Sequence, residues 1–96
     1  MRYLQKRWEE ARGDEYADWG FSIWFLEVDD ELNVLRQLEI YDSGVALKYS
    51  EVHLEDEYGC LADQPLDAED WSAYEISQGA FNESWNSAQA LNERTK

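Results

Sequence analysis

The sequence predicts an α+β domain: an antiparallel β-meander of about four strands with a C-terminal amphipathic helix packed on one face. Two patterns predict this class. The first half of the chain alternates apolar and aromatic segments with short polar turns, which is typical of antiparallel strands. The end of the chain spaces its apolar residues three and four apart behind a serine, which is typical of a helix. With 96 residues, the chain has room for a single domain, residues 1–96.

The first two strands are expected at residues 1–8 and 21–28. The intervening residues 9–20 are polar and contain glycine, so we expect a loop there. Residues 21–28 read Phe-Ser-Ile-Trp-Phe-Leu-Glu-Val, which is rich in the β-branched and aromatic types that favour strands. Alternation puts apolar side chains on both faces of this strand. It should therefore be central in the sheet or covered on each side.

Two further strands should follow at residues 34–41 and 45–49. The acidic residues and asparagine of 29–33 supply turn chemistry before the first of them. Asp42-Ser43-Gly44 is a hairpin signal between the two strands. Beyond them we expect a short extended piece through Val52 and Leu54, and then an acidic loop.

The C-terminal part is predicted to be helical in two places. Asp67 would cap one helical turn over residues 67–71. Ser77 is the expected N-cap of a longer helix that runs to about Asn92. Its apolar residues share one face that should lie on the sheet: Phe81, Trp85, Ala88 and Leu91.

The charge of the chain is strongly negative and unevenly distributed. Twenty-two acidic residues face 8 basic ones, which gives a formal net charge of −14, and no lysine or arginine occurs between Tyr49 and Glu93. Such a field favours a cationic partner and disfavours nucleic acid or an anionic membrane, because both require phosphate neutralisation by lysine or arginine. A hydrophobic content of 44% and an aromatic content of 15% exclude a disordered acidic tail.

Cysteine use and hydropathy indicate a soluble cytoplasmic protein. The single cysteine, Cys60, cannot form an internal disulfide, which fits a reducing compartment. The first residues lack the apolar core of a signal peptide, and no run approaches the roughly 18 apolar residues of a membrane span. Nothing in the sequence calls for a cofactor.

Short motifs at both ends of the chain resemble a known family. The first half contributes Met1-Arg2-Tyr3-Leu4 with Trp8, Glu27-Val28-Asp29-Asp30, the strand from Arg36 to Tyr41, and Asp42-Ser43-Gly44; the second contributes Tyr74-Glu75-Ile76-Ser77, Phe81 and Trp85. Together they resemble a small bacterial domain-of-unknown-function family often encoded in polymorphic toxin and contact-dependent inhibition loci. The resemblance implies an immunity protein, which binds and silences a neighbouring toxin. Residues 11–20 and 55–59 follow no pattern of the family, and partner specificity would be expected to vary there.

The only histidine, His53, offers a candidate for chemistry. If residues 51–55 are extended, Glu51, His53 and Glu55 share one side, as in a metal site or a general base with an orienting acid. The alternative, which we prefer, is the solvated face of an edge strand. Cys60 as a nucleophile would need an electropositive setting, and its neighbours are acidic, so a structural cysteine is preferred.

Aromatic residues in the polar loops have two interpretations. Tyr16 and Trp19 lie among acidic residues, and Tyr58 lies between Glu57 and Gly59. Aromatic residues in such settings are enriched at interface hot spots, but they also fold back over a sheet. Both alternatives stay open at this point.

The preferred function is that of a non-enzymatic immunity protein, bound 1:1 as a monomer to a basic toxin, for which we expect a nuclease. The residues expected to contact the toxin are Glu51, Glu55, Asp56, Glu57 and Asp63 through charge, with Tyr58 and Trp19 as anchors. One alternative is an acidic DNA mimic, for instance a phage inhibitor of a nucleic-acid-binding defence protein. Another is a small hydrolase or metal enzyme that uses His53.

Overall fold

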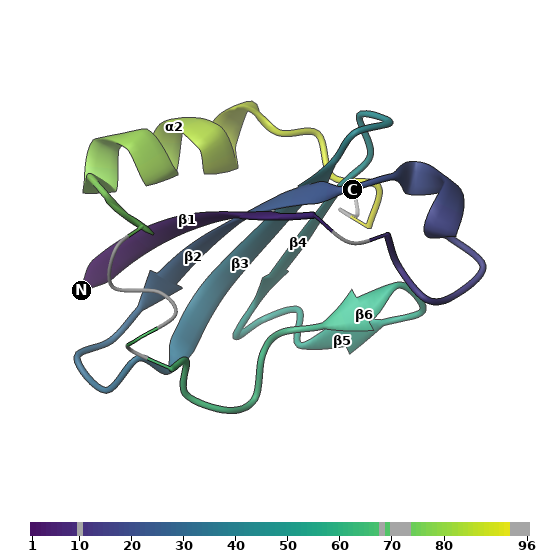
Figure 1. Cartoon of the computed structure of the whole chain (residues 1–96). Helices are drawn as coiled ribbons and strands as arrows, with labels where there is room; N and C mark the ends of the chain where they lie inside the picture. The colour runs from purple at the N-terminus through teal and green to yellow at the C-terminus, as the bar shows by residue number, and fades with distance from the viewer. Residues whose placement is uncertain (10, 68, 70–73, 93–96) are drawn as a thin grey trace.

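The computed structural model describes residues 1–9, 11–67, 69 and 74–92 and confirms the predicted α+β class. Five antiparallel strands form one sheet in the order β4-β3-β2-β1-β7, and a helix lies on one of its faces (Figure 1). The strands of this sheet are β1 (Arg2–Trp8), β2 (Ser22–Val28), β3 (Val34–Tyr41), β4 (Ala46–Ser50) and β7 (Glu75–Ile76). The other elements that the described residues form are η1 (Ala17–Trp19), the hairpin of β5 (Glu55–Asp56) and β6 (Gly59–Cys60), and α2 (Gln78–Ser87).

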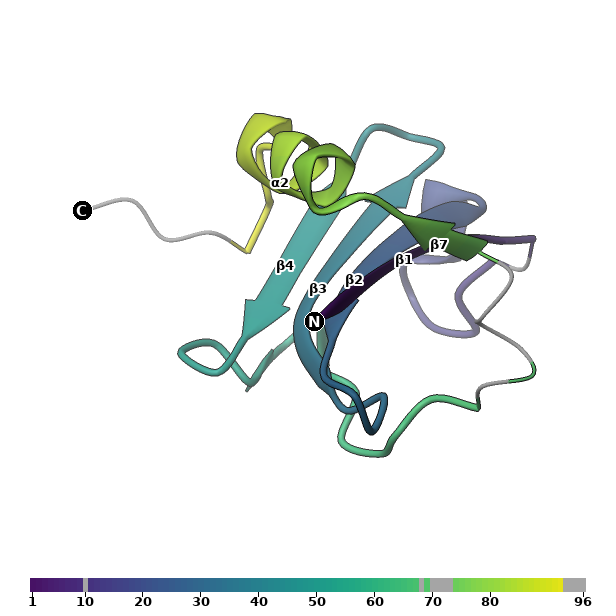
Figure 2. The same cartoon turned by 90° about the vertical axis from the view of Figure 1, so that its left-hand side faces the viewer.

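Strand β2 is central and covered on both faces, as its sequence predicts. Phe25 faces the helix within a cluster that includes Leu38 and Phe81. Leu26 and Val28 point to the opposite face, where they join a second buried cluster. A strand with apolar residues on both faces is stable only if both faces are covered. Figure 2 shows α2 over one face of the sheet, with β7 beside β1.

Helix α2 begins at the predicted cap and packs through the predicted aromatic residue. The side-chain oxygen of Ser77 accepts a hydrogen bond from the backbone N–H of Ala80 at 3.1 Å. Phe81 is fully buried, and its ring centroid lies 5.3 Å from that of Tyr3 on β1. A buried aromatic contact of this kind contributes about 1 kcal/mol beyond its apolar area.

Arg36 of β3 fastens the helix to the sheet. Its guanidinium donates two hydrogen bonds to the Glu27 carboxylate, at 2.9 and 3.0 Å, and a third to the side-chain oxygen of Asn82 on α2 at 3.0 Å. It also lies 4.8 Å from the ring centroid of Phe81. The hydrogen bonds from Arg36 lower the pKa of Glu27, so the pair stays charged at this partly buried position.

The prediction that the helix continues to Asn92 is wrong, because it ends at Ser87. Ala88 is extended, Ala90 forms a parallel bridge to Ala46, and the N–H of Leu91 donates to the Ala46 carbonyl at 2.7 Å. The side chain of Asn92 accepts from the N–H of Lys48 and donates to its carbonyl, each at 2.9 Å. The edge of β4 needs these partners, and supplying them competes with further helical turns.

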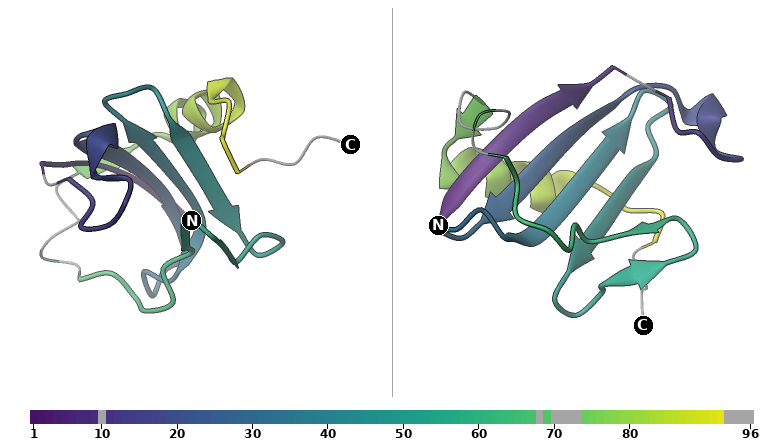
Figure 3. Two further views of the ribbon diagram at one scale, coloured as in Figure 1. Left: turned by 90° about the vertical axis from the view of Figure 1, so that its right-hand side faces the viewer. Right: turned by 60° about the horizontal axis from the view of Figure 1, so that its bottom comes forward.

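The face opposite the helix is covered, among the described residues, by the segment of residues 61–66. Leu61, Ala62 and Leu66 pack against its apolar cluster, and the β5–β6 hairpin lies beside β4 (Figure 3). The buried side chain of Gln37 accepts from the N–H of Ala62 at 3.0 Å and donates to the Cys60 carbonyl at 3.1 Å. These bonds hold the covering segment on the sheet.

Three short elements are not predicted by the sequence: η1, the β5–β6 hairpin and β7. The predicted helical turn over residues 67–71 lies partly outside the described residues; within them, the Asp67 carboxylate accepts from the N–H of Glu69 at 2.9 Å. In the part of the chain that the structure describes, no helix has the length and apolar character needed to cross a membrane.

Candidate functional site

The acidic segment after β4 begins with a tight turn, so the expected extended piece through Val52 is wrong. Ser50 and His53 exchange two backbone hydrogen bonds, at 3.1 and 3.0 Å, and leave Glu51 and Val52 at the tip. The side chains of Glu51, His53 and Glu55 are therefore not aligned on one side of an extended strand. Strand alternation cannot apply to a chain that folds back within four residues.

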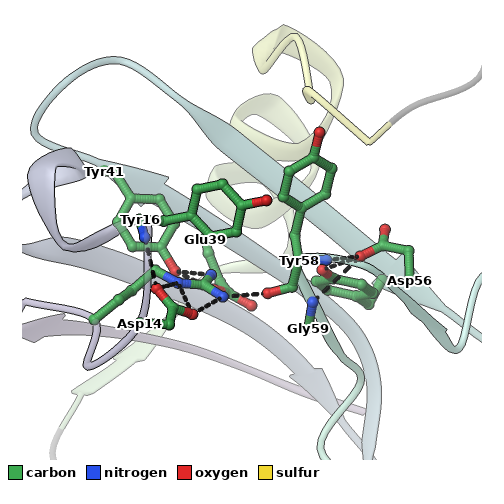
Figure 4. Close-up of polar contacts among 9 residues, drawn as sticks. Asp14, Tyr16, Glu39, Tyr41, Asp56, Tyr58 and Gly59 are labelled. Atoms are coloured by element: carbon green, nitrogen blue, oxygen red, sulfur yellow. Dashed lines mark hydrogen bonds and ion pairs between the residues drawn. The ribbon is translucent and has the colours of Figure 1, made fainter.

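Asp56 is the centre of a hydrogen-bond network next to this turn, and Figure 4 shows the part of it that involves the hairpin. One carboxylate oxygen accepts from the Tyr49 hydroxyl at 2.8 Å and from the N–H groups of Tyr58 and Gly59 at 2.8 and 3.3 Å. The other lies 2.7 Å from Nε2 of His53 and accepts from the Asn92 side chain at 2.8 Å. Asp56 thus joins β4, the turn, the hairpin and the C-terminal segment.

This network sets the charge state of Asp56. Burial opposes ionisation, but the hydrogen bonds from Asn92, His53, Tyr58 and Tyr49 outweigh it and lower the pKa of Asp56 to about 2. Burial, and then the hydrogen bond to Asp56, raises the pKa of Tyr49. The carboxylate is consequently ionised, and the phenol protonated, throughout the neutral range.

A second network connects the loop of residues 9–20 to the same hairpin. Arg12 donates to the Asp14 carboxylate at 2.8 Å and to the Tyr41 hydroxyl at 3.2 Å, and it also donates to the Tyr58 carbonyl (Figure 4). The hydrogen bond from Arg12 lowers the pKa of Asp14. The guanidinium of Arg12 therefore links the loop both to the sheet and to β5–β6.

The aromatic residues of the loops fold back over the sheet. Trp19 stacks on Tyr16 at 4.5 Å between ring centroids and lies 5.2 Å from Tyr41 and 5.9 Å from Tyr58. Trp19 and Tyr58 are both half-buried against the core cluster of Tyr41 and Tyr49. Their expected role as anchors for a partner stays a prediction, but their contacts inside the protein give each a structural role.

A carboxylate is buried beneath these loops. Glu39 is only 4% exposed, and it accepts hydrogen bonds from Gln37 at 2.8 Å and from the Tyr41 hydroxyl at 2.5 Å. Burial raises the pKa of Glu39, although both hydrogen bonds oppose this. Because its oxygens face the protein interior, Glu39 belongs to the framework and not to the surface.

The remaining acids expected to contact a partner are exposed and clustered in one segment. These are Glu51, Glu55, Glu57 and Asp63. Their carboxylates form no hydrogen bond or ion pair with any described residue. Asp56 differs from them, because both of its oxygens are engaged within the protein.

The basic residues, in contrast, are engaged inside the protein wherever the structure describes them. Arg2 pairs with Glu75 at 3.1 Å, and Arg7 lies 3.9 Å from both Glu9 and Asp42. Arg12 and Arg36 form the ion pairs given above. The ammonium groups lie over aromatic rings: that of Lys6 over Trp8 and Tyr74, and that of Lys48 over Trp85. The exposed carboxylates are therefore not neutralised by these cations.

The surroundings of His53 and Cys60 differ from those expected for a metal site or a nucleophile. His53 contacts one carboxylate, that of Asp56, and Cys60 is exposed on β6. Among the described residues, no three histidine, cysteine or acidic side chains are grouped closely enough to hold a metal ion. The enzyme alternative built on His53 thus lacks the second carboxylate that the extended arrangement would have supplied.

Sequence reasoning missed the residues that hold the site in place. Gln37 and Glu39 occupy alternate positions of a strand and resemble a solvated polar face, yet both are buried. Asn92 marks the expected end of the helix, whereas its side chain bonds to the edge of β4. The structural role of Arg12 could have been suspected from the sequence, because Arg12 is the only basic residue in the polar loop 9–20.

Comparison with known proteins gives no match to a family model, a curated protein or a solved structure. The resemblance to immunity proteins therefore stays a prediction. The fold, the paired cations and the exposed acidic segment stand on the structure alone.

Proposed function

We propose that this protein is a binding protein that neutralises a basic bacterial toxin, for which we expect a nuclease domain, and that it acts as an immunity protein without catalysis. The observation that carries the proposal is the separation of charge. Every described lysine and arginine is engaged within the protein, whereas the carboxylates of residues 51–63 other than Asp56 are left to solvent. A surface with one sign of free charge attracts a partner of the opposite sign.

A nuclease is the expected target because its substrate site must attract phosphates. Carboxylates at the surface of an inhibitor would occupy the positions of those phosphates. Complementary fields raise association rates to about 10⁸–10⁹ M⁻¹s⁻¹ at low salt. The DNA-mimic alternative is less well supported, because α2 carries a single carboxylate, that of Glu83, and offers no acidic helical surface.

A 1:1 complex is part of the proposal. The edge of β4 would be the natural place for a second copy to add a strand. There, the carbonyl of Ala46 and both backbone groups of Lys48 bond to residues 91 and 92, and the N–H of Ser50 bonds to the carbonyl of His53. Repulsion between two chains of net charge −14 also opposes self-association.

Co-expression with the toxin domain encoded beside this gene tests the proposal. The unchanged protein should restore growth and form a 1:1 complex whose affinity falls as salt rises. The triple variant E51Q/E55Q/D63N should bind at least about tenfold more weakly, which corresponds to about 1.4 kcal/mol. The matched control D30N/E31Q/E83Q removes the same charge from exposed positions elsewhere and should bind as the unchanged protein does. Continued killing, or equal loss in both variants, refutes the proposal.

A further inference from the structure

A shallow apolar pocket lies inside the acidic segment. Its apolar lining consists of Leu54, Cys60, Leu61 and Ala62, and two acidic residues, Glu55 and Asp63, complete the lining. We call these six residues the Leu54 groove. Leu54 is 58% exposed although it is a large apolar residue, so part of its surface is available to a partner.

Hydrogen bonds within the protein hold the backbone of the Leu54 groove in place without a partner. The N–H of Leu61 donates to the Leu54 carbonyl at 2.8 Å, which joins the two sides. Gln37 holds the carbonyl of Cys60 and the N–H of Ala62 from beneath. Behind the hairpin, Asp56 holds the backbone of β5–β6 in place. A rigid site loses little entropy when it binds, which favours affinity.

The charges at the groove select the occupant. The carboxylates of Glu55 and Asp63 have no partner among the described residues, and the nearby Glu51 and Glu57 add to the same field. A second copy of this chain and a nucleic acid are both negatively charged and would be repelled. A cationic polypeptide segment with an apolar side chain satisfies both the lining and the rim.

We propose that the Leu54 groove is the docking site for a basic polypeptide segment, which inserts one apolar side chain between lysines or arginines that pair with Glu55 and Asp63. The choice of a cationic protein as the partner rests on the proposed function. The groove adds the apolar part of the recognition, which slows dissociation, while the carboxylates speed encounter. Anchors in pockets surrounded by a polar rim are the usual form of an interface hot spot.

Two capped peptides of equal charge, Lys-Lys-Trp-Lys-Lys and Lys-Lys-Ser-Lys-Lys, test the groove without the toxin. In nuclear magnetic resonance titrations at about 150 mM NaCl, where charges are screened beyond about 8 Å, the tryptophan peptide should shift the amides of residues 54–63. Leu54→Ser should weaken its binding about tenfold. Val52→Ser is the matched control, because Val52 is 95% exposed at the tip of the preceding turn and does not line the groove. It should leave binding unchanged.

Cys60 gives a second readout. As the only cysteine, and an exposed one in the groove, it should be alkylated more slowly when the tryptophan peptide is bound. Equal binding of the two peptides, no loss with Leu54→Ser, or unprotected Cys60 overturns the docking site. These results are independent of the toxin experiment: growth protection without a groove effect refutes the groove alone. A groove effect without growth protection refutes the proposed function alone.

Discussion

Replacing Asp56 by asparagine removes one negative charge from an overcharged protein and should nevertheless destabilise it. The side-chain amide nitrogen of the new asparagine would replace one of the two carboxylate oxygens and is itself a hydrogen-bond donor. One oxygen of Asp56 accepts from Tyr49 and the hairpin N–H groups, and the other accepts from Asn92, so in either orientation the nitrogen would face a donor. The fall in the pKa of Asp56 from 3.8 to about 2 corresponds to about 2.5 kcal/mol. The side chain of Asp56 is 14% exposed, and solvent screening reduces this value, so we expect D56N to lower the free energy of unfolding by about 2 kcal/mol.

The pH dependence follows from the same pKa. Because the folded state lowers the pKa of Asp56, the stabilisation is complete above about pH 4 and is lost as the pH falls towards 2. Urea unfolding at pH 7, 5, 4 and 3, monitored by tryptophan fluorescence, should show a difference between the unchanged protein and D56N that shrinks at the acidic end. The control D63N makes the same chemical change at an exposed site and should stay within about 0.5 kcal/mol. An Asp56 effect no larger than that of Asp63, or one independent of pH, would refute the reasoning.

Three further predictions concern stability, measured as the free energy of unfolding in urea. Phe81→Leu should cost about 1–2 kcal/mol because Phe81 is fully buried, and a neutral result would contradict its place in the core. Gly20→Ala should cost about 1–2 kcal/mol, since φ is 84° and a Cβ would lie 3.0 Å from that of Asp42; unchanged stability would exclude this conformation. Tyr41→Phe removes the hydroxyl that accepts from Arg12, so it should cost about 1 kcal/mol and speed hydrogen exchange in the Arg12 loop; unaltered exchange would count against the tether.

Local chemistry was enough to predict the four long strands of the sheet and the start of the helix. The two apolar faces of residues 21–28 predict a strand covered on both sides, and Asp42-Ser43-Gly44 predicts the turn between β3 and β4. Ser77 predicts the N-cap because a cap needs only one side chain and the next turn of backbone. These features depend on neighbours within a few residues.

The end of the helix and the cover of the second face depend on distant partners. The chain leaves α2 at Ala88 because the edge of β4, more than 40 residues earlier, takes up residues 90–92. Gln37 is buried because the backbone of residues 60–62 crosses it. Periodicity carries no information on such contacts, so it placed Asn92 on a helix.

The exposure of most acidic residues in the candidate site could be predicted from the sequence, but the internal hydrogen bonds of Asp56 could not. Glu51, Glu55, Glu57 and Asp63 are at the surface, as the charge pattern suggests. Asp56 looks the same in the sequence, yet its partners include Asn92, which is 36 residues away. The apolar pocket beside Leu54 arises only when the hairpin and residues 61–63 come together.

Strand β1 pairs with β7, which is synthesised much later, and the same holds for the segments that cover the two faces of the sheet. The four long strands are complete once residue 50 has left the ribosome, but both faces of that sheet are still bare. One cover comes from residues 61–66 and the other from α2, while β7 must return to pair with Tyr3 and Leu4. A nascent chain of this length therefore displays two apolar faces and two open strand edges, those of β1 and β4, which are features that promote aggregation. The complete fold therefore requires that residues 61–66, 75–76 and 78–87 have left the ribosome as well.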